Sequence, residues 1–359
     1  MIEAVYHVRG DAGSIEERAR TIAVEQSVEM PVSAIADERV RNEIVGRVLG
    51  IGDLGGGAFE VRIGLSAETV GADPGQLLNM LFGNTSLHED VVLQDAVLPE
   101  GLMAAFGGPN AGLEGLWTRV GAGRRALTCS ALKPQGLSPA GLADLARRFA
   151  DGGIDYIKDD HGLADQAYSP FAARVEAVAA AIRGMPTRYL PSLTGNLDAM
   201  RGQVEAARGA GLDTVMVAPM VSGVSNLHRL ARDNPDLAFM AHPSLGGAAR
   251  ISPELLFGKL FRLFGADAIV FPNHGGRFGY SPETCRALAA AALGELGTAR
   301  SAVPVPAGGM TTDRVGEMLD FYGADIMLLI GGGLLAAGDR LPQETAAFVA
   351  AVRKHGYAT

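Results

Sequence analysis

The chain has 359 residues, 48% of them hydrophobic, and a formal net charge of −9 at pH 7. This charge argues against a nucleic-acid partner, because backbone binding needs a basic face. No apolar run reaches the roughly 18 residues of a membrane-spanning helix, so we expect no membrane segment. Two cysteines do not make a disulfide framework, and the first residues lack a signal-peptide pattern. We therefore expect a cytoplasmic protein with reduced thiols.

Residues 1 to about 115 mix strand-like and helix-like segments. The segments around 15–28 and 74–83 have helical character, whereas the strand-like runs lie at 3–8, 43–53, 59–66 and 89–98. Such a mixture predicts a small α+β domain over residues 1–115. The glycine-rich stretch 52–59 is interpreted as a hairpin tip and not as a phosphate loop, because no helix follows it.

From about residue 120 onward, apolar runs alternate with helix-like segments. The runs lie at 125–132, 154–160, 187–193, 213–219, 237–243, 267–273, 302–309 and 325–333. Continuous apolar strands of this kind are typical of a parallel sheet that is buried on both faces. Ser138, Ser252 and Ser281 each precede a proline, a pattern that predicts the start of a helix.

A Gly-x-Asp pattern recurs at near-equal intervals, just before or at the start of every second strand. It places Asp155, Asp213, Asp267 and Asp325. A polar turn residue after a helix-ending glycine accounts for each one alone. The repetition nevertheless favours an eightfold (β/α)8 TIM barrel over an open doubly wound sheet. We therefore predict an α/β protein whose residues 116–359 form the barrel and carry the active site.

Barrel enzymes place their chemistry at the carboxyl ends of the strands. The polar residues there are Lys133 after the first strand, Lys158 to His161 after the second, His242 after the fifth, and Asn273, His274 and Arg277 after the sixth. The seventh strand ends at Gly308 and Gly309, and the eighth at Gly331 and Gly332. Backbone N–H groups of such loops cradle a phosphate in many barrels, although two tight turns would explain the same glycines.

Asp160 and His161 form a carboxylate and imidazole pair that suits a divalent cation. An ammonium group at Lys158 would repel that cation. Carbamylation by CO2 would remove the positive charge and turn Lys158 into an oxygen ligand. The alternative is a salt-bridged cluster without a metal ion.

Several segments together resemble the RuBisCO large-subunit family, and the chain is identified as a RuBisCO-like protein of form IV. "GGIDYIKDDHGLADQ" resembles the segment that carries the activator lysine and the acidic metal ligands. "ALKPQGLS" is similar to the catalytic loop after the first barrel strand. Further matches are "VEQSVEMP", "LFGN", "PVPAGGM" and "LLIGGG", which follow the family's order along nearly the whole chain.

The resemblance implies a ferredoxin-like N-terminal α+β domain and a homodimer with active sites at the subunit interface. Glu25 and Asn84 would reach the site from the neighbouring subunit. Lys158 matches the carbamylated lysine and Asp160 an aspartate ligand of Mg2+ or another divalent cation. His161 stands where the carboxylases have glutamate.

Other positions depart from the carboxylases. Lys133 matches the proton-transferring lysine, but Gln135 stands where a second lysine would be. His242 matches a strand-end histidine, yet Pro243 replaces a phosphate-binding arginine and Ala307 a serine. Arg277 falls roughly where the carboxylases carry the lysine that positions CO2. These changes imply a substrate with one phosphate, and no CO2 fixation.

The family resemblance therefore implies metal-assisted enolisation and proton transfer on a phosphorylated ketose. We favour the isomerase type, acting on 5-methylthioribulose 1-phosphate in methionine salvage. Alternatives are a diketo-methylthiopentyl-phosphate enolase, whose base would be a lysine near Asn84, and decarboxylation or carboxyl transfer on a branched oxo-acid sugar phosphate. A non-catalytic sugar-phosphate-binding protein belongs to a different class, and it would not need the metal cluster.

Overall fold

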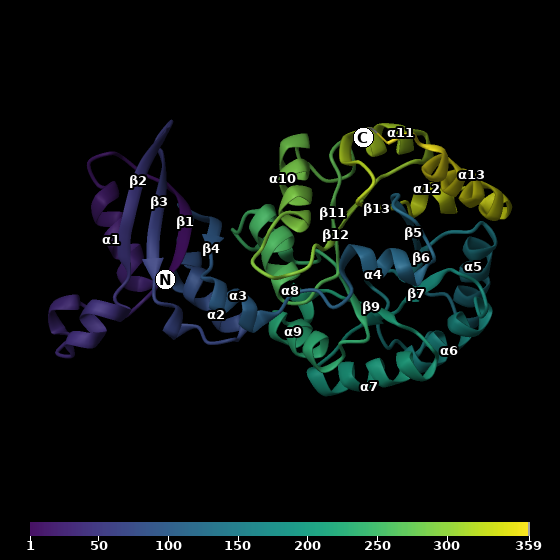
Figure 1. Cartoon of the computed structure of the whole chain (residues 1–359), viewed down its shortest axis with the longest axis horizontal. Coiled ribbons are helices and arrows are strands. Elements are labelled where there is room, and N and C mark those ends of the chain that lie inside the picture. The colour runs from purple at the N-terminus through teal and green to yellow at the C-terminus, as the bar shows by residue number, and fades with distance from the viewer. Residues whose placement is uncertain (358–359) are drawn as a thin grey trace. The chain divides into compact units, whose positions relative to one another are not determined.

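The computed structural model describes residues 1–357, which form two compact units (Figure 1). The first unit contains residues 1–107 together with 245–256 and 296–299, and the second contains the other described residues. A domain boundary between residues 115 and 116 stays a prediction. Within residues 1–357, every helix is too short or too polar to cross a lipid bilayer.

The first unit is built on a four-stranded antiparallel sheet in the order β2-β3-β1-β4. Its elements are β1 (Ile2–Arg9), α1 (Ile15–Glu25), η1 (Val32–Ala34), η2 (Val40–Ile44), β2 (Arg47–Gly55), β3 (Ala58–Leu65), η3 (Ala67–Thr69), α2 (Pro74–Phe82), η4 (Asn84–Leu87), β4 (Val91–Val97) and α3 (Glu100–Phe106). Every second residue of β1, including Tyr6, is buried, since side chains of a strand alternate between its two faces. The predicted α+β character is confirmed.

Two local predictions in this unit have different outcomes. The hairpin tip is confirmed, because Gly55, Gly56 and Gly57 join β2 to β3 with φ angles of 83°, 62° and 75°. The predicted strand over 43–53 starts too early. Residues 40–44 form the π-helical turn η2, and β2 begins only at Arg47.

The second unit is a barrel of parallel strands, as predicted. Two sheets, β13-β5-β6-β7 and β8-β9-β10-β11-β12, share one ring, because β7 and β8 are one strand interrupted at Pro191 and β12 lies beside β13. The strands are β5 (Leu127–Leu132), β6 (Tyr156–Asp159), β7 (Arg188–Leu190), β8 (Ser192–Leu193), β9 (Thr214–Val217), β10 (Ala238–Ala241), β11 (Ala268–Pro272), β12 (Val303–Ala307) and β13 (Met327–Leu329). All eight predicted apolar runs contain one of these strand positions.

Helices of the second unit follow most of its strands and lie around them (Figure 1). The helical elements after residue 107 are α4 (Gly112–Arg119), which precedes β5, α5 (Pro139–Asp151), α6 (Phe171–Ala181), α7 (Leu197–Gly209), α8 (Pro219–Ser222), α9 (Val224–Asp233), η5 (Gly246–Ala248), which belongs to the first unit, η6 (Glu254–Phe261), α10 (Pro282–Leu293), η7 (Thr312–Arg314), α11 (Val315–Tyr322), α12 (Gly332–Leu335), η8 (Gly338–Arg340) and α13 (Leu341–Lys354). The three predicted helix starts are confirmed. The hydroxyls of Ser138, Ser252 and Ser281 each accept a hydrogen bond from the backbone N–H three residues further on, at 3.1–3.2 Å.

The repeated aspartates fasten the amino ends of the strands, away from the expected chemistry. Asp267 is fully buried and accepts three backbone N–H groups, from Ala111 at 2.6 Å, Gly112 at 2.8 Å and Phe239 at 2.7 Å. Asp155 binds the guanidinium of Arg125 at 2.7 and 2.8 Å. These contacts give Asp155 and Asp267 a structural role in the barrel.

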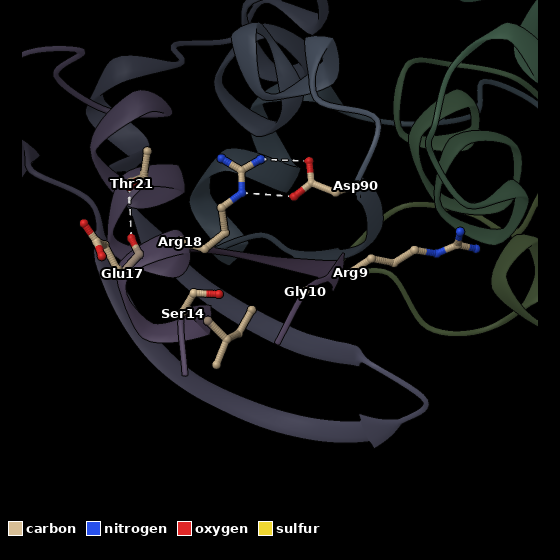
Figure 2. A pocket seen from close by; sticks show the side chains of 8 residues that line it. Arg9, Gly10, Ser14, Glu17, Arg18, Thr21 and Asp90 are labelled. Carbon is tan, nitrogen blue, oxygen red and sulfur yellow. Dashed lines mark hydrogen bonds and ion pairs between the residues drawn. The ribbon is translucent and has the colours of Figure 1, made fainter. Parts of the chain in front are cut away.

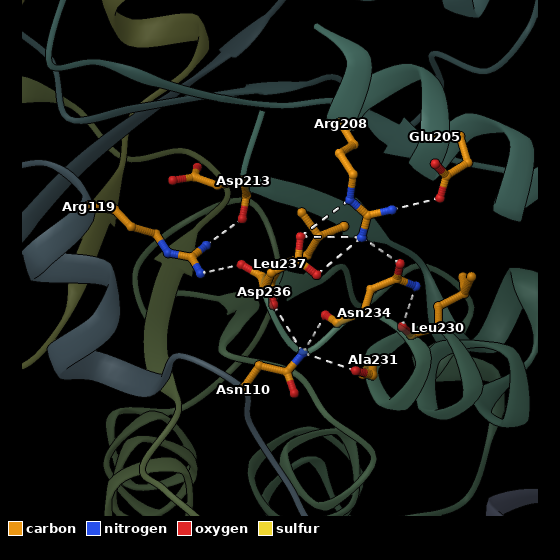
Figure 3. Close-up of polar contacts among 10 residues, drawn as sticks. All are labelled: Asn110, Arg119, Glu205, Arg208, Asp213, Leu230, Ala231, Asn234, Asp236 and Leu237. Carbon is orange, nitrogen blue, oxygen red and sulfur yellow. Dashed lines mark hydrogen bonds and ion pairs between the residues drawn. The ribbon is translucent and has the colours of Figure 1, made fainter. Parts of the chain in front are cut away.

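A polar network joins neighbouring segments of the same unit (Figure 3). The amide of Asn110 donates to the carbonyl oxygens of Ala231, Asn234 and Leu237, each at 3.0 Å. Arg208 binds Asn234 at 2.8 Å and Glu205 at 2.6 Å. Satisfied polar groups of this kind fix the loop that leads into β10.

Replacement of Asp267 by alanine should lower the free energy of unfolding by about 3 kcal/mol, because three buried N–H groups lose their acceptor. Asp144→Ala on the exposed face of α5 is the control, with an expected change within about 0.5 kcal/mol. Urea unfolding measures both. Equal stabilities of the two variants would contradict this assignment.

The destabilisation caused by Asp267→Ala should depend on pH. Burial raises the pKa of the Asp267 carboxyl to about 6. A carboxyl whose folded pKa lies above its unfolded value adds most to the free energy of unfolding below about pH 4. This contribution is lost as the pH rises through about 6. The destabilisation by Asp267→Ala should therefore be larger at pH 5 than at pH 8.

Candidate active site

Consecutive side chains at the end of β6 point to opposite faces of the barrel wall. Lys158 is only 3% exposed and lies on the same face as Tyr156, which belongs to the apolar core. Asp159 faces the other way. It accepts hydrogen bonds from the Tyr189 hydroxyl at 2.7 Å and the Arg174 guanidinium at 3.1 Å. Asp159 is therefore a structural carboxylate, and it is not part of the candidate site.

Asp160 is the centre of the polar cluster that follows β6. Its Oδ1 atom lies 3.0 Å from Lys133 Nζ and 3.3 Å from His161 Nδ1, and Gln135 Nε2 donates to its Oδ2 at 3.4 Å. Burial alone would raise the pKa of this carboxyl, but the contacts with His161 and Lys133 hold it below its usual range. The loops after β5 and β6 thus bring together the residues predicted for proton transfer and metal binding.

His242 joins this cluster from the end of β10. Its ring stacks on that of His161 with centroids 4.6 Å apart and an interplanar angle of 6°. Burial, followed by the charge on Lys158, lowers the pKa of His242 to about 2, so the ring is neutral at physiological pH. Nδ1 of His242 faces Ser244, whose backbone N–H lies 3.3 Å and whose hydroxyl lies 2.8 Å from it.

Lys158 lies beneath these groups. Its Nζ donates to the Asp159 carbonyl oxygen at 2.8 Å. Burial lowers the pKa of the Lys158 ammonium, and the nearby charge of Lys133 acts in the same direction. The neutral amine, which is the form that reacts with CO2, is therefore easier to reach at Lys158 than in an exposed lysine.

The glycine loops after β12 and β13 differ in what surrounds them. Gly308 and Gly309 have φ angles of 91° and 97°, and the Arg277 backbone N–H donates to the Gly308 carbonyl at 2.9 Å. Gly331 and Gly332 precede and begin α12, and a Cβ added to either would meet open space. Arg277 is thus brought against the first glycine pair, whereas the second pair leaves its backbone accessible.

Gly309→Ala should raise the KM for a phosphorylated substrate about tenfold or more, because a Cβ would lie 3.0 Å from Arg277 N in a backbone region that disfavours alanine. Gly202→Ala in α7 is the control, since open space surrounds that position. Its KM should match that of the unmodified protein. An unchanged KM in Gly309→Ala would remove this loop from the phosphate site.

His274 lies apart from the cluster around Asp160. Its ring packs against Phe321 of α11 with centroids 4.4 Å apart, and its Nε2 is buried without a hydrogen-bond partner. Burial lowers the pKa of this imidazole. A substrate-binding role for His274 stays a prediction, and its position beside α11 does not favour it.

Glu25 and Asn84, the residues expected from a neighbouring subunit, meet in the first unit. Asn84 Nδ2 donates to Glu25 Oε1 at 2.9 Å and to Glu29 Oε1 at 2.6 Å. The contact joins the end of α1 to η4. Whether this pair serves an active site stays a prediction.

Sequence reasoning missed three residues of these clusters. Gln135 was noted only as a lost lysine, yet its amide contacts Asp160. The Ser244 hydroxyl lies 2.8 Å from His242 Nδ1, and its place two residues after a strand-end histidine was the available signal. Glu29 lies within the family-matching segment "VEQSVEMP", but its pairing with Asn84 could not be predicted because the two residues are distant along the chain.

The donor atoms of the cluster fit a divalent cation only if a third ligand joins Asp160 and His161. Among residues 1–357, no three His, Cys, Asp or Glu side chains gather closely enough to hold a metal ion. Asp160 Oδ1 is buried and lies 3.0 Å from Lys133 Nζ and 3.3 Å from His161 Nδ1, so Asp160 and His161 supply two candidate ligands. The third has to come from another residue type, and Lys158, as a carbamate, is the candidate that burial makes reactive.

A pocket of the first unit lies elsewhere (Figure 2). It has a volume of about 360 Å³ and is lined by Arg9, Ser14, Glu17 and Arg18 among others. Arg18 is engaged by Asp90 at 2.9 and 3.0 Å, which ties α1 to the loop before β4. None of the predicted site residues lines this pocket.

The fold and the cluster define a barrel protein with lysines, a carboxylate and imidazoles at the carboxyl ends of its strands. The chain belongs to the RuBisCO large-chain family, since a model of "ribulose bisphosphate carboxylase large chain, catalytic domain" matches residues 112–355. This membership confirms the resemblance found in the sequence.

Individual relatives cover nearly the whole chain. It is 60% identical over 358 residues to a 5-methylthioribulose-1-phosphate isomerase of Rhodospirillum rubrum, with 98% of this chain and 96% of the relative covered. A 2,3-diketo-5-methylthiopentyl-1-phosphate enolase of Geobacillus thermodenitrificans is 31% identical, with 90% and 85% covered. The crystal structure of a Rubisco-like protein from Rhodopseudomonas palustris superposes with a TM-score of 0.93 at 51% identity, covering 100% and 99% of the two chains.

Proposed function

We propose that this protein is an isomerase that moves a proton along a phosphorylated ketose, with 5-methylthioribulose 1-phosphate as the substrate. The observation that carries the proposal is the cluster of Lys133, Asp160, His161 and His242 at one end of the barrel. The 60% identity to the Rhodospirillum rubrum isomerase, over almost the full length of both chains, supports the choice of substrate. The reaction would not fix CO2.

Mg2+ or another divalent cation would be held by Asp160, His161 and the carbamate of Lys158. When bound, the cation would stabilise negative charge on the substrate oxygens as the proton next to the carbonyl leaves. The low pKa of Asp160 keeps this ligand ionised at neutral pH. Because the third ligand would be the carbamate of Lys158, bicarbonate should be needed together with the metal.

Lys133 and His242 are the proposed proton carriers. Lys133 Nζ lies beside Asp160 and is about one-third exposed, so it reaches both the cluster and solvent. The neutral ring of His242 stacks on His161 within the same cluster. One group would take the proton from the carbon next to the carbonyl, and a proton returned to the former carbonyl carbon would complete the isomerisation without any other reactant.

The glycines Gly308, Gly309, Gly331 and Gly332 would hold the single phosphate through backbone N–H groups, with Arg277 beside the first pair. Pro243 offers no cation to a second phosphate, and neither does the buried Ala307. A bisphosphate should therefore bind poorly.

We further propose a cytoplasmic homodimer in which Glu25 and Asn84 of the 1–115 domain complete the site on the partner's 116–359 barrel. Their hydrogen bond supports a joint role. The alternative enolase activity is favoured by the 31% identity to the Geobacillus thermodenitrificans enolase. Asn84 weighs against it, because an amide is not a base.

A panel of substrates followed by phosphorus NMR tests this function. With Mg2+ and bicarbonate, 5-methylthioribulose 1-phosphate should convert to an isomeric ketose phosphate. Neither 2,3-diketo-5-methylthiopentyl 1-phosphate nor ribulose 1,5-bisphosphate should react at a comparable rate. Faster turnover of the diketone would replace the isomerase assignment by the enolase.

A further inference from the structure

Glu29 lies just beyond α1 in an unusual backbone conformation. Its φ is 55°, in the left-handed region that residues with a side chain rarely adopt. Within residues 1–357, Leu245 is the other non-glycine residue with a positive φ. Such a conformation persists where the surrounding structure holds it, and it often accompanies a functional role.

The residues around Glu29 hold its backbone in this conformation. Its backbone N–H donates to the Val24 carbonyl at 2.9 Å, which closes the last turn of α1. The buried Gln26 then ties this turn to η4 and α2. Its side chain accepts from the Thr85 N–H at 3.1 Å and donates to the Met80 carbonyl at 2.8 Å. The end of α1 and η4 are thus locked together at the place where Glu29 meets Asn84.

Both N–H donors of the Asn84 amide are engaged in hydrogen bonds. An asparagine side chain offers two N–H donors on one nitrogen and an acceptor oxygen. Nδ2 serves Glu29 at 2.6 Å and Glu25 at 2.9 Å, and two carboxylates leave no doubt about which amide atom is the nitrogen. The free group of Asn84 is therefore its carbonyl oxygen Oδ1.

We propose that Glu29 is a positioning residue that fixes Asn84 so that Oδ1 accepts a hydrogen bond from a hydroxyl of the ketose phosphate. This inference rests on the proposed function, in which Asn84 reaches the substrate. Ketose hydroxyls are donors and match an acceptor-only surface made of Oδ1 and the remaining carboxylate oxygens. Without Glu29, one N–H of Asn84 becomes free and the amide is held by Glu25 alone.

Two variants with the same net charge separate this role from a structural one. Glu29→Gly removes the acceptor but suits the left-handed backbone, so the melting temperature should not fall. Its KM should rise about tenfold with kcat changed less than about twofold, because a contact made equally in ground and transition states is lost. Glu29→Gln retains a side-chain oxygen of the same reach and should restore most of the affinity. An unchanged KM in Glu29→Gly would overturn the proposal.

Hydrogen exchange of the Asn84 side-chain amide gives a readout that needs no turnover. In 15N-asparagine-labelled protein, the Nδ2 signals, identified by their loss in Asn84→Ala, should exchange slowly, and faster in Glu29→Gly. Equal exchange rates in both proteins would overturn the positioning role. If the unmodified protein does not convert 5-methylthioribulose 1-phosphate, the proposed function fails, while the exchange rates still decide whether Glu29 orients Asn84.

Discussion

Lys158→Met should lower kcat by about a thousandfold or more and abolish the dependence of activity on Mg2+, because the proposed metal site loses its third ligand. The variant should fold. Methionine has a similar length, and it removes an amine that is only 3% exposed and therefore costly to keep charged. Steady-state kinetics and a Mg2+ titration by calorimetry measure the two effects.

A matched control and a spectroscopic test accompany this variant. Lys354→Met, at the exposed end of α13, changes the same charge and should leave activity and metal binding unaltered. In 13C-bicarbonate, the unmodified protein should show a carbamate carbon signal that Lys158→Met lacks. Full activity in Lys158→Met would contradict the metal site.

Lys133→Met should lower kcat by about a thousandfold while Mg2+ binding persists, because it removes a proton carrier and leaves the candidate ligands in place. Lys133→Arg should not restore the rate. A guanidinium does not release its proton near neutral pH and has a different shape from an ammonium group. The measurement is single-turnover kinetics with metal affinity determined on the same samples.

The two lysine variants are most informative side by side. Loss of turnover with retained metal binding in Lys133→Met, and loss of both in Lys158→Met, would separate proton transfer from metal binding. Loss of Mg2+ affinity in Lys133→Met would instead make that lysine part of the metal site.

Much of the barrel could be predicted because its physical signal is local. Continuous apolar runs identify strands that are buried on both faces, and the serine-proline pairs give helix starts such as that of α5. The π-helical turn at Val40–Ile44 was missed, because Ile44 and Val45 run directly into the apolar residues of the strand that follows.

The candidate site was only partly predictable. Lys133, Asp160, His161 and His242 follow strand ends, and parallel strands bring such ends together. The direction in which each side chain points was harder to predict. Alternation along β6 turns Asp159 towards Arg174, and the aromatic side chain of Phe321 draws His274 towards α11. Pairings such as Glu29 with Asn84 join distant positions, and no periodicity in one sequence reports them.

Proton NMR in D2O tests the central claim most directly. The unmodified protein and Lys158→Ala are each incubated with 5-methylthioribulose 1-phosphate, Mg2+ and bicarbonate. We expect an isomeric ketose phosphate to appear with the unmodified protein and to be absent with the variant. A spectrum in which the unmodified protein gives neither an isomer nor deuterium on the substrate carbons would contradict a metal-dependent isomerase.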